Sequence, residues 1–335
     1  MKMSKITLKN KRIVLTGGSG FVGSYLLESL IKNNKICIID NEYRGSNISY
    51  IKKTYPKYFK KNVKVDQIDI RNKNELEKIL RKFNPEIIFH LAGIAGVKTV
   101  ISKPLQVIDV NLIGSYNLAI ITPKLKSLKK LIYTSTSEVY GPTAYHLEED
   151  SFTTQGNAYD PRWSYSTSKL FAEHIFVAVE REYGVPITIA RLFNIYGPRQ
   201  IGSGAIHEFV KKSIVNKPLT IFDDGLQIRA WCYIDDCILG LRTIAEKSSG
   251  IFNIGSPSES LTSVALAQLV IRLSKSKAKL IYKKLLSSDV RIRVPNIKKI
   301  SKLGYMPKVK LEEGLIKTIK WYKQTLNWVN AEYSY

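Results

Sequence analysis

Short apolar runs alternate with stretches of mixed apolar and polar residues through the first part of this chain. The runs are rich in Ile and Val, as buried strands are, and lie at residues 11–16, 35–40, 63–70, 86–92 and 130–134. Between them, apolar positions recur at helix spacing over residues 21–32 and 74–82, and Pro85 ends the second stretch. This alternation predicts a parallel, doubly wound α/β sheet with ligands beyond the carboxyl ends of its strands.

The turn between the first predicted strand and helix contains Gly17, Gly20 and Gly23, and the helix opens with Phe21 and Val22. This spacing allows a tight turn, close approach of the backbone to a pyrophosphate, and packing of the helix on its strand. The helix N-terminus offers unpaired N–H groups to the phosphates. The turn therefore predicts a dinucleotide site in a Rossmann-type fold, although a strand-to-helix turn without a ligand has the same pattern.

An acidic residue, Asp40, ends the second run 17 residues beyond Gly23. This is close to the spacing at which a carboxylate binds a ribose 2′-hydroxyl. A carboxylate there repels a 2′-phosphate, so NAD is favoured over NADP, but the nearby Arg44 weakens this preference. The alternative is that Asp40 only forms the turn that ends the strand.

Three other residues at strand ends are expected to border the cofactor, namely Asp69, Ile70 and Ala92. Ala92 and the glycine after it are small enough for a cofactor to approach the backbone. Asn111 interrupts an apolar helical stretch, and two interpretations remain open for it: a buried polar link to the sheet, or an ordinary packing defect.

Hydroxyl groups and one carboxylate follow the fifth run, at Thr136, Ser137 and Glu138. Reacting groups belong at such a strand end, although these residues would also serve as helix caps. The next predicted helix extends to about residue 183 and carries Tyr165 and Lys169, which share one face because they are four residues apart. We expect the ammonium group to lower the pKa of the phenol from about 10 towards neutrality.

Beyond residue 200, helices are predicted at 205–216, 261–274 and 311–322, a short strand at 219–223, and a strand followed by a helix at 231–245. Residues 250–255 are expected to return to the main sheet as a strand. Because no Pro/Gly/Ser-rich linker separates the halves, we expect two interleaved units. Residues 1–199, joined by about 230–256, would form the Rossmann-type domain, and residues 200–335 a smaller α/β substrate-binding lobe.

The net charge of +24 raises the question of nucleic-acid binding, but the lysines spread over the polar faces of many helices. We therefore expect a positively charged solvated surface and no specific nucleic-acid site. The three cysteines are scattered and the four histidines do not cluster, which argues for reduced thiols and no metal. The basic segment 1–12 has no apolar signal core, and no apolar run approaches a membrane span, so we expect a cytoplasmic protein with no membrane contact.

With these residues in hand, the chain resembles the extended short-chain dehydrogenase/reductases that act on nucleotide sugars with NAD. The resemblance covers nearly the whole chain and rests on residues 16–23, Asp40, Asp69, Thr136 with Glu138, Tyr165 with Lys169, residues 191–199 (Arg-Leu-Phe-Asn-Ile-Tyr-Gly-Pro-Arg) and residues 224–229 (Asp-Gly-Leu-Gln-Ile-Arg). It implies that Tyr165 is the base for a sugar hydroxyl while hydride passes from C4 to NAD. Lys169 would hold the tyrosinate and the nicotinamide ribose, and Thr136 the reacting oxygen.

The same resemblance implies residues that bind the nucleotide sugar. Asn194 and Arg229 would hold its diphosphate, Arg199 is counted with them, and Arg291 fits the diphosphate-binding arginine of many epimerases. Family members usually pair through two helices of the first domain, here residues 102–124 and 165–183, so a homodimer is expected.

Ser137 and Glu138 help to distinguish the possible reactions, because simple 4-epimerases tend to carry no carboxylate at the position of Glu138. Thr-Ser-Glu resembles UDP-glucuronate decarboxylases, and so do Arg-Trp-Ser-Tyr at residues 162–165 and Arg293 two residues before a proline. Arg293 would hold the C6 carboxylate, while Ser137 and Glu138 would orient it and supply or relay a proton. Decarboxylation of UDP-glucuronate to a UDP-pentose or UDP-4-keto-pentose is therefore expected.

Other reactions remain open. Gln200 looks more like epimerases and dehydratases, so a nucleotide-sugar 4-epimerase or 4,6-dehydratase is the alternative. A non-catalytic protein that binds NAD or nucleic acid is a more distant one.

Overall fold

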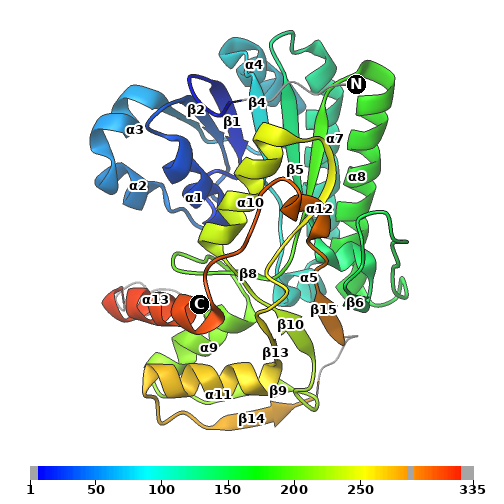
Figure 1. Cartoon of the computed structure of the whole chain (residues 1–335). Helices are drawn as coiled ribbons and strands as arrows, with labels where there is room; N and C mark the ends of the chain where they lie inside the picture. Colours follow the sequence, from blue (N-terminus) through cyan, green and yellow to red (C-terminus); the bar gives the residue numbers. More distant parts are fainter. Residues whose placement is uncertain (1–6, 285–289, 326–335) are drawn as a thin grey trace.

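A sheet of seven parallel strands forms the upper part of the computed structural model, which describes residues 7–284 and 290–325 (Figure 1). In spatial order the strands are β12 (Gly250–Ile254), β7 (Ile187–Leu192), β5 (Lys130–Thr136), β4 (Ile87–His90), β1 (Arg12–Thr16), β2 (Lys35–Ile39) and β3 (Val63–Asp66). The predicted doubly wound parallel α/β sheet is thereby confirmed. Residues 1–6, part of the segment from which the absence of a signal sequence was judged, lie outside the described residues.

Alternate residues of the central strand β1 pack into two different cores. Ile13 and Leu15 lie in a core with α1 (Phe21–Leu30) and α10 (Ile234–Lys247) on one side of the sheet. Val14 lies in a second core on the other side, with α4 (Lys73–Phe83) and α8 (Ser164–Tyr183). Because both faces are covered by helices, the strands are apolar throughout, which explains the continuous Ile- and Val-rich runs.

One long helical segment occupies residues Pro104–Lys124 of that second helix layer. It consists of α6 (Pro104–Ile108), a π-helical turn (Asp109–Ile113), α7 (Gly114–Ile121) and a 3₁₀ turn (Thr122–Lys124), and it follows α5 (Val97–Ser102). By length and composition this segment is apolar enough to cross a membrane, although polar residues interrupt its apolar positions. Half of it is buried inside the fold, where it packs against α4 and α8, as the core helix of a globular domain does.

The remaining strands lie mostly below the main sheet in Figure 1. A four-stranded sheet has the order β13 (Ser260–Thr262), β10 (Ile228–Ala230), β15 (Ile292–Val294) and β6 (Thr143–Tyr145), and two-stranded pairs join β11 (Cys232–Tyr233) to β8 (Ile195–Tyr196) and β14 (Leu280–Lys283) to β9 (Leu219–Phe222). The helices here are α9 (Ala205–Ile214), α11 (Ser263–Ser274) and α13 (Leu311–Gln324). Because β6 comes from the first half of the chain and β12 joins the main sheet from the second, the two halves exchange strands.

Several local details differ from the sequence predictions. Strand β3 ends at Asp66 rather than near residue 70, because Asp69 forms a turn in which its carboxylate and its carbonyl accept the N–H groups of Arg71 and Asn72, both at 2.9 Å. Two unpredicted helices, α2 (Ile48–Thr54) and α3 (Pro56–Asn62), and α12 (Lys298–Ser301) complete the fold with 3₁₀ turns at Ser137–Tyr140 and Pro161–Trp163. All three cysteines of the sequence lie in the described part and are buried and free.

Candidate active site

The glycine turn after β1 has a physical reason for each of its glycines. Gly17 has a φ of +71°, and a methyl group there would lie 2.6 Å from the backbone nitrogen of Ala92. A methyl on Gly23 would lie 2.2 Å from the carbonyl oxygen of Gly17, so this glycine lets α1 pack on the turn. A methyl group on Gly20 would lie 3.4 Å from its nearest neighbour, the carbonyl oxygen of Gly17. The space beside Gly20 is therefore open to a ligand.

The N-terminus of α1 begins with Phe21 and Val22 and has no side-chain cap. Its first N–H groups are therefore available to an anion, and the helix dipole favours one. Ala92, which crosses under Gly17, is half-buried at the exit of β4. This uncapped helix end beside an open glycine fits the pyrophosphate of a dinucleotide such as NAD.

Asp40 lies directly beside the glycine turn. Its carboxylate accepts the N–H of Ser19 at 2.9 Å and the N–H of Glu42 at 2.8 Å, and burial raises its pKa against these two hydrogen bonds. Arg44 makes no ion pair with Asp40, because its guanidinium lies against Gly202 on another loop. Among the described residues, no cation pairs with Asp40 that could also bind a 2′-phosphate. This agrees with the expected preference for NAD.

The two other predicted cofactor contacts differ from each other. Asp69 accepts a hydrogen bond from Asn41 at 3.0 Å, which joins the ends of β2 and β3 beside the site of the cofactor. The side chain of Ile70 is buried in the core and fills the space above Gly114, so only its backbone would be open to a ligand.

Tyr165 and Lys169 lie on α8 as predicted, but the pKa of the phenol shifts in the opposite direction from the expectation. Burial, together with the charge of Glu138, raises the pKa of Tyr165 to about 12 against a hydrogen bond with Thr136 and the charge of Arg44. Burial likewise lowers the pKa of Lys169 to about 7. The physical reason is desolvation, which disfavours the charged form of both groups.

The ammonium group of Lys169 lies over the ring of Tyr133. Its Nζ lies 4.6 Å from the centre of the Tyr133 ring, and a methyl group on Gly93 would be 3.6 Å from it. Asn111 lies beside the same glycine, accepts the N–H of Ile94 at 2.7 Å and donates to the Ile94 carbonyl at 3.1 Å. Of the two interpretations of Asn111, the buried polar link is therefore confirmed, and it fixes the loop beneath which Lys169 lies.

Glu138 is held by arginines from two other elements. Arg162 donates to both of its carboxylate oxygens, at 2.6 and 2.8 Å, and Arg293 approaches one of them at 3.3 Å. Burial alone would raise the pKa of Glu138, but the guanidinium groups outweigh it and the pKa is lowered. Glu138 therefore pairs with arginines from two other elements, and their charges favour its ionised form.

Arg162 is the functional residue that sequence reasoning missed. It lies three residues before Tyr165, in the 3₁₀ turn Pro161–Trp163, and only about 5% of it is exposed. It belongs to the Arg-Trp-Ser-Tyr motif, but the sequence does not predict its pairing with Glu138, which lies 24 residues earlier in the chain.

The second lobe contributes two of the predicted arginines to this cluster. Arg229 on β10 is paired in register with Arg293 on β15, so both point to the same face of that sheet. The charge of Arg229 lowers the pKa of Glu138 together with those of Arg162 and Arg293. Ser137 is buried in the 3₁₀ turn beside Glu138.

The other predicted substrate residues are not brought into this cluster. Arg199 is buried, bonds to Glu28 at 2.6 Å and lies 3.6 Å from the centre of the Tyr25 ring, so its side chain is committed to α1. Arg291 is exposed and forms an ion pair with Asp224 at 3.5 Å. The amide of Asn194 donates to the carbonyl of Ala230 at 2.9 Å, which holds the end of β7 against the second lobe.

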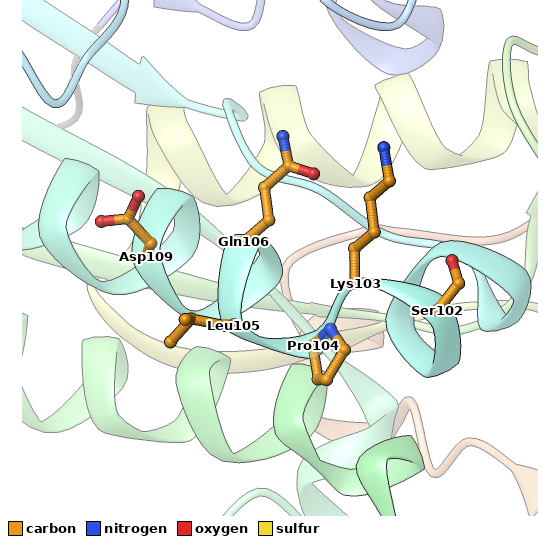
Figure 2. A pocket seen from close by; sticks show the side chains of 6 residues that line it. All are labelled: Ser102, Lys103, Pro104, Leu105, Gln106 and Asp109. Atoms are coloured by element: carbon orange, nitrogen blue, oxygen red, sulfur yellow. The ribbon is translucent and has the colours of Figure 1, made fainter.

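A surface hollow lies apart from these groups, at the start of the segment Pro104–Lys124 (Figure 2). It is lined by Ser102, Lys103, Pro104, Leu105, Gln106 and Asp109, and Lys103 and Gln106 point to the same side of the chain. The hollow is open and none of its lining residues follows a strand of the main sheet. It is therefore not the site of the chemistry.

Comparison with known proteins agrees with this geometry. The family model "NAD dependent epimerase/dehydratase family" matches residues 13–255. The chain is 33% identical over 330 residues to the UDP-N-acetyl-alpha-D-glucosaminuronate decarboxylase of Bacillus cytotoxicus, covering 95% of this chain and 99% of the relative. It is 33% identical to UDP-glucuronic acid decarboxylase 6 of Arabidopsis thaliana, covering 94% of this chain and 90% of that one.

A solved structure gives the same result. UDP-glucuronic acid 4-epimerase from Bacillus cereus, in complex with UDP-glucuronic acid and NAD, matches with a TM-score of 0.83 and 30% identity over 94% of this chain and 99% of the other. The resemblance to extended short-chain dehydrogenase/reductases is thus confirmed. The chain belongs to the NAD dependent epimerase/dehydratase family and is an NAD-dependent enzyme that modifies nucleotide sugars.

Proposed function

We propose that the protein decarboxylates UDP-glucuronate to a UDP-pentose or UDP-4-keto-pentose. The observation that carries this proposal is the arginine cluster at Glu138. Three guanidinium groups, from Arg162, Arg229 and Arg293, lie close enough to the carboxylate of Glu138 to lower its pKa, and Glu138 in turn acts on Tyr165. A cluster of this kind suits a second carboxylate, such as C6 of a hexuronate, because a guanidinium fork binds carboxylates with two parallel hydrogen bonds.

The first step is proton removal from the C4 hydroxyl of the sugar. When bound, NAD supplies the hydride acceptor for C4 and a positive charge beside the phenol. Tyr165 takes the hydroxyl proton, and Thr136, which hydrogen bonds to Tyr165, holds the same oxygen. Lys169 lies four residues after Tyr165 on α8, and its ammonium group would hold the tyrosinate and the nicotinamide ribose.

The second step follows from the ketone at C4. The carboxylate at C6 then belongs to a β-keto acid, so the C5–C6 bond breaks, carbon dioxide leaves, and the electron pair moves onto the C4 oxygen. Thr136 stabilises this oxygen, and the arginines orient the carboxylate before it leaves. The proton that replaces C6 at C5 comes from solvent, and Ser137 and Glu138 are the residues that would relay it.

A 4-epimerase acting on a UDP-hexuronate is the second candidate, because it too must hold a C6 carboxylate. The solved Bacillus cereus epimerase is named with UDP-glucuronic acid, and Gln200 of this chain resembles epimerases. A 4,6-dehydratase remains the third candidate, but it acts on a sugar whose C6 group is neutral and needs no guanidinium group to bind it.

The test is to follow C6 of the sugar. Purified protein is incubated separately with UDP-glucuronate labelled with carbon-13 at C6, UDP-N-acetylglucosaminuronate, UDP-glucose and dTDP-glucose, and products are identified by NMR. We expect labelled carbon dioxide from UDP-glucuronate. Retention of the label with inversion at C4 would make the protein an epimerase, and turnover of only the neutral sugars would reject the arginine argument.

An arginine variant with a matched control sharpens this test. Arg293→Met should lose at least 100-fold in carbon dioxide release, because it removes one of the guanidinium groups near Glu138 while keeping an unbranched apolar stem. Arg272→Met is the control, since Arg272 is exposed and pairs with Glu312 on the far helix α13. If both variants turn over UDP-glucuronate like the wild type, the cluster does not bind the carboxylate.

We also propose that the protein is a homodimer that pairs through residues 102–124 and 165–183. Large apolar side chains are exposed on both segments, including Leu105, Tyr116 and Phe171, of which Leu105 is 77% exposed. A symmetric dimer would bury them. Light scattering on the full chain should give twice the mass of 38.0 kDa, and Leu105→Asp with Tyr116→Asp should give the monomer mass.

A further inference from the structure

Arg44 lies in the loop between β2 and α2, and its charge has no partner. Its half-buried guanidinium makes no hydrogen bond or ion pair with any residue in the described ranges 7–284 and 290–325. The loop itself is fixed to the glycine turn, because the backbone N–H of Asn47 donates to the Ser19 carbonyl at 2.8 Å and its side chain donates to the Arg199 carbonyl at 3.2 Å. A fixed loop that presents an unpaired cation points to a ligand with negative charge.

Two other loops meet at this guanidinium. A methyl group on Gly202 would lie 1.7 Å from Nη2 of Arg44, and one on Gly96 would lie 2.3 Å from Oγ of Ser203 and 3.7 Å from the same Nη2. Both glycines have positive φ values, +87° and +106°. The loop after β4, the loop before α9 and the Arg44 loop are therefore in contact, with no room for a single side chain between them.

The Arg44 loop lies near two parts of the candidate active site. The Arg44 loop begins at Asp40, beside the glycine turn, while the guanidinium is close enough to Tyr165 for its charge to lower the pKa of that phenol. Oγ of Ser203 is buried there without a hydrogen-bond partner among the described residues. Arg44 and Ser203 thus bring two unsatisfied polar groups to the point where these loops meet.

We propose that Arg44 is a clasp that closes these three loops over NAD and keeps the cofactor bound from one turnover to the next. The guanidinium of Arg44 and the N-terminus of α1 would both bind the negatively charged diphosphate of the cofactor. Gly96 and Gly202 are glycines because the closed loops leave no space for a side chain. Retention serves chemistry in which the hydride taken from C4 is later returned, since a reduced cofactor that escapes stops the cycle. The proposal rests on the use of NAD by the family and not on the choice of sugar.

The experiment measures cofactor retention directly. Wild type, Arg44→Gln, Arg44→Lys and the surface control Arg81→Gln are passed through gel filtration, and the NAD and NADH released by denaturation are counted per chain. The dissociation rate of NADH is then measured by fluorescence with an excess of NAD as competitor. We expect Arg44→Gln to release NADH at least 10-fold faster, Arg44→Lys to be intermediate, and Arg81→Gln to match the wild type, since Arg81 is an exposed residue of α4.

A second variant tests the contact itself. Gly202→Ala should also speed release, because its methyl group displaces the guanidinium, and the double variant with Arg44→Gln should be no faster than Arg44→Gln alone. Additive effects would contradict the contact, and release from Arg44→Gln within twofold of the wild type would overturn the clasp. Carbon dioxide release from UDP-glucuronate, measured at saturating NAD, reports separately on the proposed reaction.

Discussion

Replacing Glu173 by Gln should strongly destabilise the fold, because it leaves a buried arginine without its counter-charge. Glu173 on α8 and Arg191 on β7 are joined by two hydrogen bonds of 2.7 and 3.1 Å, and each side chain is only 4% exposed. Arg191 also donates to the carbonyl of Glu149 at 3.1 Å and lies 4.7 Å from the centre of the Tyr140 ring. The pair therefore fastens the helix that carries the catalytic tyrosine to the main sheet.

The magnitude follows from the burial of the pair. Gln has the same size as Glu and retains one acceptor, so the substitution removes the charge and little packing. Leaving one member of a buried ion pair uncompensated costs about 3–5 kcal/mol, and the Coulomb energy of two charges 4 Å apart is about 4 kcal/mol at an effective dielectric constant of 20. This is a large fraction of the ~5–15 kcal/mol that stabilises a typical fold.

The assay is urea unfolding followed by tryptophan fluorescence, with Glu313→Gln as the matched control. Glu313 pairs with Lys317 one turn later on α13, and both side chains are about half exposed, at 53% and 47%. Losing such a pair costs about 0.5 kcal/mol or less. If Glu173→Gln costs less than about 1 kcal/mol, or no more than the control, the buried pair is hydrated in solution and the reasoning fails.

The same substitution should alter the pH dependence of turnover. Glu173 lies four residues after Lys169 on α8, and its charge raises the pKa of that lysine against the larger effect of burial. Without it the pKa of Lys169 falls further, so the lysine loses its proton at lower pH. The alkaline limb of the pH–rate profile should move to lower pH in Glu173→Gln, and an unchanged profile would show that Lys169 does not titrate during turnover.

Three other substitutions give separate tests. Tyr165→Phe should abolish turnover while NAD stays bound, as judged by nucleotide release from denatured protein; unchanged turnover would remove the phenol from the mechanism. Gly23→Ala should lower the free energy of unfolding by about 1–3 kcal/mol and weaken NAD binding, because its methyl group meets the Gly17 carbonyl at 2.2 Å; calorimetry with and without NAD checks both effects. Lys130→Met should cost about 2–3 kcal/mol, since Lys130 donates to three carbonyls that end or follow α10. Burial lowers the pKa of Lys130 to about 8, whereas its value in the unfolded chain is near 10.4. Between these two pH values the unfolded chain binds more protons than the folded one, so the free energy of unfolding of the wild type rises with pH. The urea midpoint of the Met variant should lack this rise.

The parts of the fold and site that sequence predicts are those decided within a few residues. The three glycines of the turn, the carboxylate of Asp40 and the pair of Tyr165 and Lys169 each depend on one spacing within one or two adjacent elements. The main sheet follows likewise, because strands covered on both faces are apolar throughout. Such signals need no knowledge of which distant segments meet.

The parts that sequence does not predict depend on such meetings. Arg199 follows the family motif, yet it ends in an ion pair with Glu28, 171 residues away. Arg162 is a neighbour of Tyr165 along the chain, yet its role comes from Glu138 on another turn. The pKa of Tyr165 was predicted from the one charge on its own helix, whereas burial and charges from three other segments decide its direction.

This difference explains why the motifs identify the family more readily than the reaction. The cofactor site is made by β1, α1 and the loops that follow β2 and β4, all within the first hundred residues, and every member that oxidises C4 needs the same groups. In the proposed function, the charge around the sugar comes from Arg162, in a turn before α8, and from Arg229 and Arg293 on two short paired strands. A change in any one of these three elements would alter what the site does to C6 without disturbing NAD. The proposed decarboxylation therefore rests on the arginines around Glu138 and not on the motifs of the cofactor site.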